Sequence, residues 1–326
     1  MAGTVLVTGA GGFIGSHLVE ALVTAGHRVR ALMRYNGRSD LGNLNLVPPE
    51  VRATVDLVHG DITDPFVMRT AVDGCSVVYH LAALIAVPYS YASPRHVFDT
   101  NVMGTLHVAH ACVQAGAALV HMSSSEVYGS AQEVPIRETH PLVGQSPYAA
   151  SKIGADQCVA SFHRTYGLRT VTVRPFNTFG PRQSARAVVP TIIAQGLVGR
   201  TVRLGTVHTT RDLNYVTDTV SGLIAAGTAV DRIAGETLNL GTGVEVSIAE
   251  LVDRIAAQLG FALRIETDSA RLRPVASEVT RLLADASRAR TLLGWQPRVS
   301  LDEGLARTVE FIRRHLDRYR PKEYVL

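Results

Sequence analysis

Two short stretches of the chain concentrate hydroxyl, carboxylate and amino groups. The first, SSSEVYG at 123–129, holds three serines and Glu126, and the second, SPYAASK at 146–152, holds Tyr148 and Lys152. Because Tyr148 and Lys152 are four residues apart, a helix would place them on one face. An ammonium group beside a phenol stabilises the phenolate and would move the tyrosine pKa from about 10 toward neutrality. The pair therefore predicts a general base in which Lys152 activates Tyr148.

A glycine-rich turn near the start of the chain reads TGAGGFIG and lies between an apolar strand-like run and an apolar-periodic helix. Gly9 permits a tight turn, Gly12 lets the backbone approach a pyrophosphate, and Gly15 lets the helix pack closely on the strand. The helix N-terminus favours negative charge. The turn, with Phe13 and Ile14 inside it, predicts a dinucleotide-binding cradle.

The elements that position these residues alternate in type. Strand-like runs such as TVLVTG, SVVYHLA, ALVHMSS and RTVTVRP are separated by helix-like segments. This alternation predicts an α/β fold, a Rossmann-type doubly wound parallel sheet. The later part of the chain is less regular and carries Pro- and Arg-bearing loops, which predicts a smaller C-terminal substrate-binding lobe. We expect 1–175 with 210–243 to form the dinucleotide-binding domain, and 176–209 with 244–326 to form the lobe.

Composition narrows the class of protein. Among 326 residues, 46% are hydrophobic and 18% are charged, with a formal charge of +4 and no block of basic residues. An anionic small molecule therefore explains the charge at least as well as nucleic acid, for which no basic, aromatic-bearing stripe is found. Cys75, Cys112 and Cys158 are scattered, so neither disulfides nor a metal site is predicted, and a cytoplasmic location is expected. The apolar run at 77–87 is too short to span a membrane.

Several motifs together resemble the extended short-chain dehydrogenase/reductases that act on nucleotide sugars. They are the GxxGxxG spacing of the first turn, the YxxxK pair, HLAA at 80–83 and RPFNTFGPR at 174–182. The resemblance covers nearly the whole chain. It implies a sugar nucleotide oxidised at C4 of the sugar by bound NAD, and a homodimer in which helices near 95–115 and 148–166 pair across a two-fold axis.

The resemblance also implies which residues bind the cofactor. An Asp usually ends the second strand in this family, whereas this chain has Met33 and then Arg34, which could meet a 2′-phosphate. We therefore expect NAD and leave NADP open. Asp61 matches the adenine contact and Asn101 the active-site Asn, with a helix N-cap as the alternative for each. The other cofactor-binding residues implied are Gly9, Gly12, Phe13, Ile14, Gly15, Ile62, Leu81, Ala82, Ala83, Tyr148, Lys152 and Pro175.

The residues at the end of the strand-like run ALVHMSS, and those that follow it, bear on the type of reaction. Ser124 falls where the family has the Ser or Thr that positions the substrate. Nucleotide-sugar 4,6-dehydratases commonly continue with Asp-Glu, in which the Asp protonates the departing hydroxide and the Glu takes the C5 proton. This chain reads Ser125-Glu126, and serine is too weak an acid to replace the Asp directly. A 4-keto hexuronate loses CO₂ without a leaving-group proton, so we expect decarboxylation of UDP-glucuronate to UDP-4-keto-pentose, UDP-xylose or both.

Three alternatives stay open at this point. The stretch at 124–129 and RPFNTFGPRQ are similar to UDP-glucuronate decarboxylases, but PYSY at 88–91, QSPYAASKIGADQ at 145–157 and SARAVVPTII at 184–193 look closer to the 4,6-dehydratases of legionaminic-acid-type pathways. A sugar-nucleotide 4-epimerase is the second alternative, although it needs no carboxylate at Glu126. The third is a non-enzymatic NAD(P)-binding redox sensor.

Residues of the second half are expected to hold the nucleotide sugar. Guanidinium groups suit phosphate and carboxylate oxygens. Arg211 and Arg273 match the family's diphosphate contacts best, and Arg182 or Arg281 is the candidate for a sugar carboxylate. The substrate-binding residues implied are Asn177, Arg182, Arg186, Val189, Arg211, Arg273 and Arg281.

Overall fold

The large sheet of the protein has seven parallel strands. The computed structural model describes residues 3–321 and 323, and in it the strand order is β10-β6-β5-β4-β1-β2-β3. Every neighbouring pair is parallel. The strands are β1 Thr4–Thr8, β2 Arg28–Met33, β3 Asp56–His59, β4 Cys75–His80, β5 Ala118–Met122, β6 Thr170–Pro175 and β10 Thr237–Leu240. The predicted α/β fold is confirmed.

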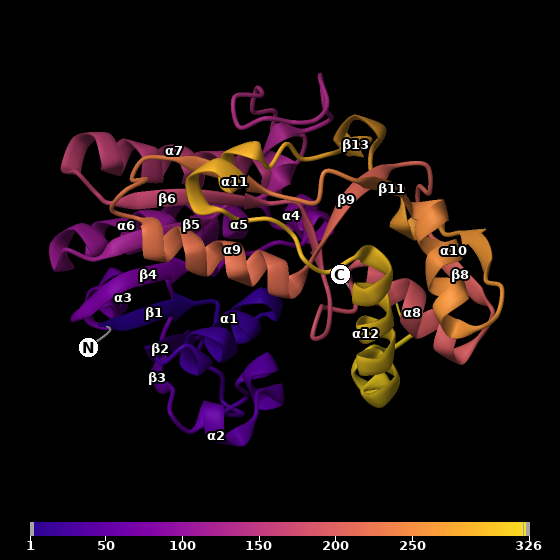
Figure 1. Cartoon of the computed structure of the whole chain (residues 1–326), viewed down its shortest axis with the longest axis horizontal. Helices are drawn as coiled ribbons and strands as arrows, with labels where there is room; N and C mark the ends of the chain where they lie inside the picture. The colour runs from indigo at the N-terminus through magenta and orange to yellow at the C-terminus, as the bar shows by residue number, and fades with distance from the viewer. Residues whose placement is uncertain (1–2, 322, 324–326) are drawn as a thin grey trace.

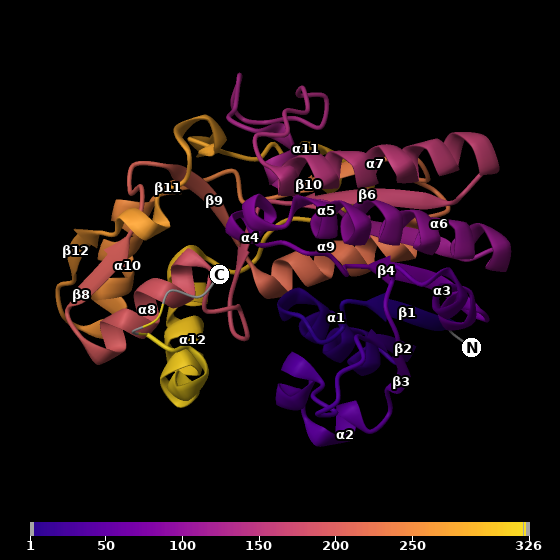
Figure 2. The same cartoon turned by 180° about the vertical axis from the view of Figure 1, so that it is seen from behind.

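Helices cover both faces of this sheet (Figures 1 and 2). One face carries α1 Phe13–Thr24, α9 Val216–Ala229 and α11 Ser287–Leu293, and the other carries α3 Pro65–Val72, α6 Gly104–Ala115 and α7 Pro147–Tyr166. Shorter helices are α2 Pro49–Arg52, α4 Val87–Ala92 and α5 Pro94–Phe98. The double cover explains why the central strands are so apolar, since all six residues of β6 are buried.

A smaller lobe lies at one end of the sheet (Figure 1). It contains α8 Val188–Val198, α10 Ile248–Leu259 and α12 Leu301–Arg314, with β8 Thr201–Leu204 pairing in parallel with β12 Arg264–Thr267. A small sheet joins lobe and core, in which β9 Thr210–Tyr215 pairs with β7 Asn177–Phe179, β11 Glu245–Ser247 and β13 Arg281–Leu282.

The expected division of the chain between the two parts stays a prediction, but two elements bear on it. Strand β10 joins the large sheet, as expected for 210–243. Helix α11 lies within the range assigned to the lobe, yet it packs against α9 and β10. None of the helices in the described part of the chain is both long and apolar enough to cross a membrane.

The topology indicates where a ligand binds. Strand β1 lies between β2 and β4, so the direction in which the strand order runs reverses at β1. In open α/β sheets, ligands bind outside the carboxyl ends of the strands at the point of this reversal. The glycine turn follows β1, the motif HLAA begins at the last residue of β4, and the serines and Glu126 follow β5. The motifs found in the sequence therefore meet at one edge of the sheet.

Candidate active site

The glycine turn between β1 and α1 is tightly packed. Gly9 has a φ of 69°, a conformation that side-chain-bearing residues rarely adopt, and a Cβ there would lie 2.8 Å from the backbone nitrogen of Ala82. At Gly15 a Cβ would lie 2.1 Å from the carbonyl oxygen of Gly9. The backbone of Gly12 begins α1 as its N-cap. The packing of the turn therefore leaves no room for a side chain at Gly9 or Gly15.

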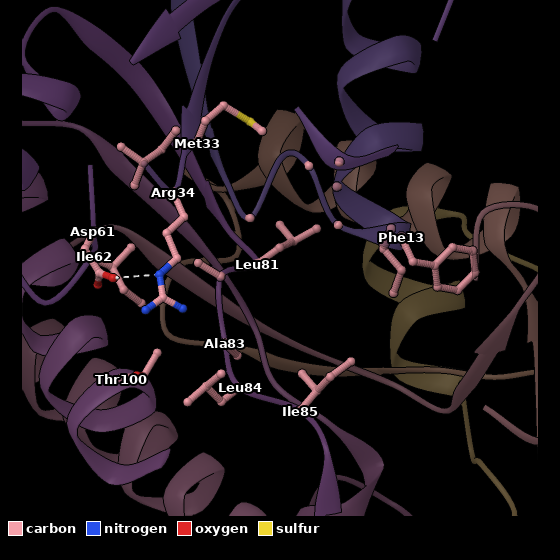
Figure 3. Close-up of a pocket in the computed structure, with 18 of the residues that line it drawn as sticks. Phe13, Met33, Arg34, Asp61, Ile62, Leu81, Ala83, Leu84, Ile85 and Thr100 are labelled. Atoms are coloured by element: carbon pink, nitrogen blue, oxygen red, sulfur yellow. Dashed lines mark ion pairs between the residues drawn. The ribbon is translucent and has the colours of Figure 1, made fainter. Parts of the chain in front are cut away.

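A cavity of about 440 Å³ lies against this turn (Figure 3). Its walls come from the glycine turn, the ends of β2 and β4, and the segment after β3. The residues predicted to bind the cofactor that line it are Gly9, Gly12, Phe13, Ile14, Gly15, Arg34, Asp61, Ile62, Leu81, Ala82 and Ala83. An apolar crevice against backbone amides at a helix N-terminus suits an adenosine and a pyrophosphate. Thus the residues present fit a dinucleotide.

Arg34 and Asp61 pair at one side of the cavity. The Arg34 side chain points toward Asp61 in Figure 3, with 3.5 Å between Nε and Oδ2, and 71% of it is exposed. Asp61 also accepts hydrogen bonds from the backbone and the hydroxyl of Thr63. Although partial burial opposes them, these bonds and the Arg34 charge hold the pKa of Asp61 below its ordinary value. The N-cap alternative for Asp61 is wrong, because Asp64 caps α3.

Tyr148 and Lys152 lie on one buried face of α7, as their spacing predicts. The helix begins where expected because the Ser146 hydroxyl accepts a hydrogen bond from a backbone amide of the first turn. The Lys152 ammonium donates to the carbonyl oxygen of Met122, at the end of β5, over 2.8 Å. Ser124, the residue expected to position the substrate, interacts with the Tyr148 hydroxyl and lowers its pKa.

Burial controls the acidity of this pair. It raises the pKa of Tyr148 to about 12, and the hydrogen bond with Ser124 offsets this only in part, while the charges of Glu126 and Asp156 raise the pKa further. Burial also lowers the pKa of Lys152 to about 8, against the attraction of Asp156. The expected shift of the tyrosine pKa toward neutrality is not seen in this structure, because desolvation of the phenolate dominates, and activation of Tyr148 by Lys152 stays a prediction.

Glu126 lies in a short 3₁₀ turn, Ser125–Tyr128, directly after the Ser124 cap. Ser125 is buried and Glu126 is half-buried. The Glu126 charge raises the pKa of Tyr148 in α7. Burial lowers the pKa of Arg211 in β9, and the Glu126 charge opposes this shift. The turn that carries Glu126 therefore contacts α7, and the Glu126 charge acts both on the expected base and on an arginine expected to bind phosphate.

Asn101 is buried and ties two segments of the site together. Its side-chain oxygen accepts from the Leu84 amide over 2.8 Å, and its side-chain nitrogen donates to the Leu84 carbonyl and to the Ser151 hydroxyl over 2.9 Å each. It lies inside a continuous helical stretch, in a π-helical turn between α5 and α6, so the N-cap alternative is wrong. Asn101 therefore holds the segment after β4 against α7.

Arg211 and Arg273 meet at one carboxylate. A terminal nitrogen of each lies near Oε1 of Glu278, at 3.6 Å and 3.8 Å, and only 8% of the Arg211 side chain is exposed. Within the described part of the chain, Nη1 of Arg273 and the side-chain oxygen of Asn177 are buried without a hydrogen-bond partner. Two guanidinium groups facing one carboxylate leave a net positive site, which suits an anionic ligand.

The other predicted substrate residues lie elsewhere. Arg182 pairs with Glu20 of α1 over 2.7 Å, and Arg281 pairs with Glu245 over 2.9 Å between Nε and Oε2. Among the described residues, no interaction joins either of these two arginines, the candidates for binding a sugar carboxylate, to Tyr148 or Glu126. The Arg186 side chain donates to Ser184 in the loop before α8, Val189 is buried in the first turn of α8, and Pro175 ends β6.

Sequence reasoning missed a buried acid, Asp156, which lies four residues after Lys152 and accepts hydrogen bonds from Arg174. The signal for it was the same spacing that identified the pair, since residues four apart share a helix face. A carboxylate on the inward face of a helix needs a partner there. Arg174, inside the RPFNTF motif, is that partner.

Comparison with known proteins agrees with this geometry. The family described as GDP-mannose 4,6 dehydratase matches residues 6–308. A UDP-glucose 4-epimerase of Mycolicibacterium smegmatis is 38% identical, over 94% of this chain and 98% of its own. UDP-glucuronic acid decarboxylase 1 of Arabidopsis thaliana is 32% identical, over 96% of this chain and 70% of its own. A crystal structure of the dTDP-glucose 4,6-dehydratase of Streptomyces venezuelae with NAD bound is 32% identical, with a TM-score of 0.87, and covers 98% of this chain and 100% of its own.

Proposed function

Because the chain belongs to the GDP-mannose 4,6 dehydratase family of extended short-chain dehydrogenase/reductases, we propose that it is an NAD-dependent nucleotide-sugar 4,6-dehydratase. The substrate is a nucleotide hexose with a free C6 hydroxyl, which is oxidised at C4 and then loses water between C5 and C6. The observation that carries this proposal is the Glu126 carboxylate, in a turn that contacts α7, whose charge acts on both Tyr148 and Arg211. A simple 4-epimerase needs no carboxylate there.

The cofactor site of the proposal is the cavity over the glycine turn. The amides at the N-terminus of α1 would hold the pyrophosphate, and Asp61 and Ile62 would lie against the adenosine. When bound, NAD would supply a positively charged hydride acceptor for C4 and then a hydride donor for C6, and its charge would favour loss of the Tyr148 proton. Tyr148 takes the proton of the C4 hydroxyl, and Ser124, which interacts with the Tyr148 side chain, positions that hydroxyl.

Glu126 supplies the next proton transfers. Once C4 is a ketone, the C5 proton is acidic, and the Glu126 carboxylate can take it. Glu126 is then a carboxylic acid, and it can give the same proton to the C6 oxygen as the C6–O bond breaks and the C5–C6 double bond forms. One carboxylate therefore balances the proton of the elimination, and an acidic residue in place of Ser125 is not required. This path needs the C5 hydrogen and the C6 oxygen on the same side of Glu126.

Dehydration is favoured over decarboxylation by the arginines. A hexuronate would bring a second carboxylate next to Glu126, and like charges at close range repel. The guanidinium group expected to neutralise it is that of Arg182 or Arg281, and these two are paired with Glu20 and Glu245, respectively. A neutral C6 hydroxyl has no such requirement.

Decarboxylation of UDP-glucuronate to UDP-4-keto-pentose, UDP-xylose or both is the second candidate, and Ser125 favours it. Ser125 is buried beside Glu126, where many 4,6-dehydratases have an acid. Loss of CO₂ from a 4-keto hexuronate needs no proton on a leaving group. In that reaction Arg211 or Arg273 would have to meet the sugar carboxylate.

The two reactions are separated by product mass. The protein is incubated with NAD and with UDP-glucose, UDP-N-acetylglucosamine, UDP-glucuronate and the dTDP and GDP counterparts, and the products are analysed by mass spectrometry. We expect a hexose product lighter by one water, and UDP-glucuronate unchanged. Loss of CO₂ from UDP-glucuronate would support the second candidate, and an isomer of unchanged mass would support epimerisation.

Glu126→Gln is the matched variant, because the amide keeps the size of the side chain and cannot take the C5 proton. It should still reduce NAD on mixing with the substrate, which absorbance reports, but release no dehydrated product. Dehydration by Glu126→Gln at the wild-type rate would contradict the role of Glu126.

A further inference from the structure

Asp156 is a buried carboxylate, 4% exposed, one helical turn beyond Lys152. Its Oδ2 accepts hydrogen bonds from the Ser123 hydroxyl over 2.9 Å and from Nη2 of Arg174 over 2.9 Å. Its Oδ1 lies 3.1 Å from Nε2 of His121, which can donate to it. Both carboxylate oxygens are thus bound by groups from β5, from β6 and from the residue that follows β5.

The same network reaches the turn that carries Glu126. Arg174 donates from Nη1 to the Tyr128 hydroxyl over 3.0 Å, and that hydroxyl donates to Asn239 of β10 over 2.7 Å. Tyr128 is the last residue of the turn that contains Glu126. One chain of hydrogen bonds therefore connects α7, the strands beneath it and the turn, through buried groups with defined partners.

We propose that Asp156 is a positioning residue of the active site, which keeps the positive charge of Lys152 beside Tyr148 and anchors, through Arg174, the turn that presents Glu126. This inference rests on the proposed function of Tyr148 and Glu126 and on the prediction that Lys152 activates Tyr148. Asp156 itself touches neither substrate nor cofactor in this account. It acts through its neighbours.

The charges around Lys152 support this role. Burial lowers the pKa of Lys152, and Asp156 is the group that opposes the shift. The groups that interact electrostatically with Lys152 are Asp156 of α7, His80 of β4 and His121 of β5. Tyr148 lies one helical turn before Lys152 on the same buried face of α7. Burial lowers the pKa of both histidines, and both are neutral near pH 7. Arg174 is bound to Asp156. Without this carboxylate, Lys152 would lose its proton at a lower pH.

The amino-acid composition makes a direct test simple. The chain has two lysines, Lys152 and Lys322. In protein labelled at the lysine Cε, the NMR signal of each side chain reports its protonation, and Lys152→Arg assigns the two signals. The titration needs no turnover, so it can fail independently of the proposed reaction, which the product masses test.

Asp156→Asn should make the proton affinity of Lys152 fall about tenfold or more, because the negative charge of Asp156, one helical turn away, favours the charged lysine. The alkaline limb of the kcat/KM profile should move to lower pH by the same factor. Asp156→Glu should restore most of both. Asp253→Asn makes the same chemical change at an exposed acid of α10 and should alter neither.

Asp156→Asn leaves the buried Arg174 without its partner and destabilises the fold, so the double variant Asp156→Asn with Arg174→Gln removes both charges of the pair. The group that opposes the lowering of the Lys152 pKa is Asp156, and the double variant, which also lacks this carboxylate, should show a fall in the same direction. A folded single or double variant whose Lys152 titrates as in the wild type would overturn the proposal, and Asp156 would then be a purely structural partner of Arg174.

Discussion

Replacing Gly15 with alanine would test the cradle at its closest contact. The new Cβ would lie 2.1 Å from the carbonyl oxygen of Gly9, whereas ordinary contacts begin near 3.4 Å. The turn or α1 must therefore shift by about an ångström, and the atom in the way belongs to the backbone. Forcing an extra carbon into a packed region costs about 1–3 kcal/mol. If this strain falls on the conformation that binds pyrophosphate, NAD binding weakens by about 5- to 150-fold.

Isothermal titration of NAD into Gly15→Ala and the wild type measures this effect, and circular dichroism shows whether the variant is folded. Gly199→Ala is the control, because a Cβ there meets a single atom at 3.8 Å and the residue lies at the end of α8 in the lobe. Its NAD affinity should equal that of the wild type. A folded Gly15→Ala that binds NAD within twofold of the wild type would refute the argument that this contact shapes the site.

Three further predictions concern the base, the cofactor and the assembly. Tyr148→Phe should bind NAD normally but lose at least ~10²-fold in turnover, as for removal of a general base, and steady-state kinetics with turnover near that of the wild type would refute this role. NADP should bind more weakly than NAD because Arg34, the residue that could meet a 2′-phosphate, is paired with Asp61. In titrations of both cofactors, Asp61→Asn should narrow the difference in affinity, and equal affinity of the wild type for both would contradict this reasoning. We also expect a homodimer through α6 and α7, which light scattering at micromolar concentration would disprove by giving a monomeric mass.

The features that the sequence predicted correctly depend on local spacing. Gly9 and Gly15 were identified because a tight turn between strand and helix constrains residue type at fixed offsets. Tyr148 and Lys152 were paired because residues four apart share a helix face. The alternation of apolar runs was enough to predict the parallel sheet.

The features that sequence reasoning missed depend on contacts between distant residues. The pKa of Tyr148 is set by how deeply α7 is packed, which no local pattern reports. Arg182 was assigned to a sugar, but its partner, Glu20, lies in the first helix of the chain. Likewise, no periodicity shows that Arg174 of β6 lies beneath Asp156 of α7.

The central claim is that oxidation at C4 leads to elimination between C5 and C6, with Glu126 moving the proton. The most direct measurement follows deuterium from C4 of the nucleotide hexose that the protein converts, by NMR and mass spectrometry of the product. The account predicts a product lighter by one water in which the deuterium removed from C4 is recovered at C6. A product that has lost no water and carries the deuterium at C4 would contradict it.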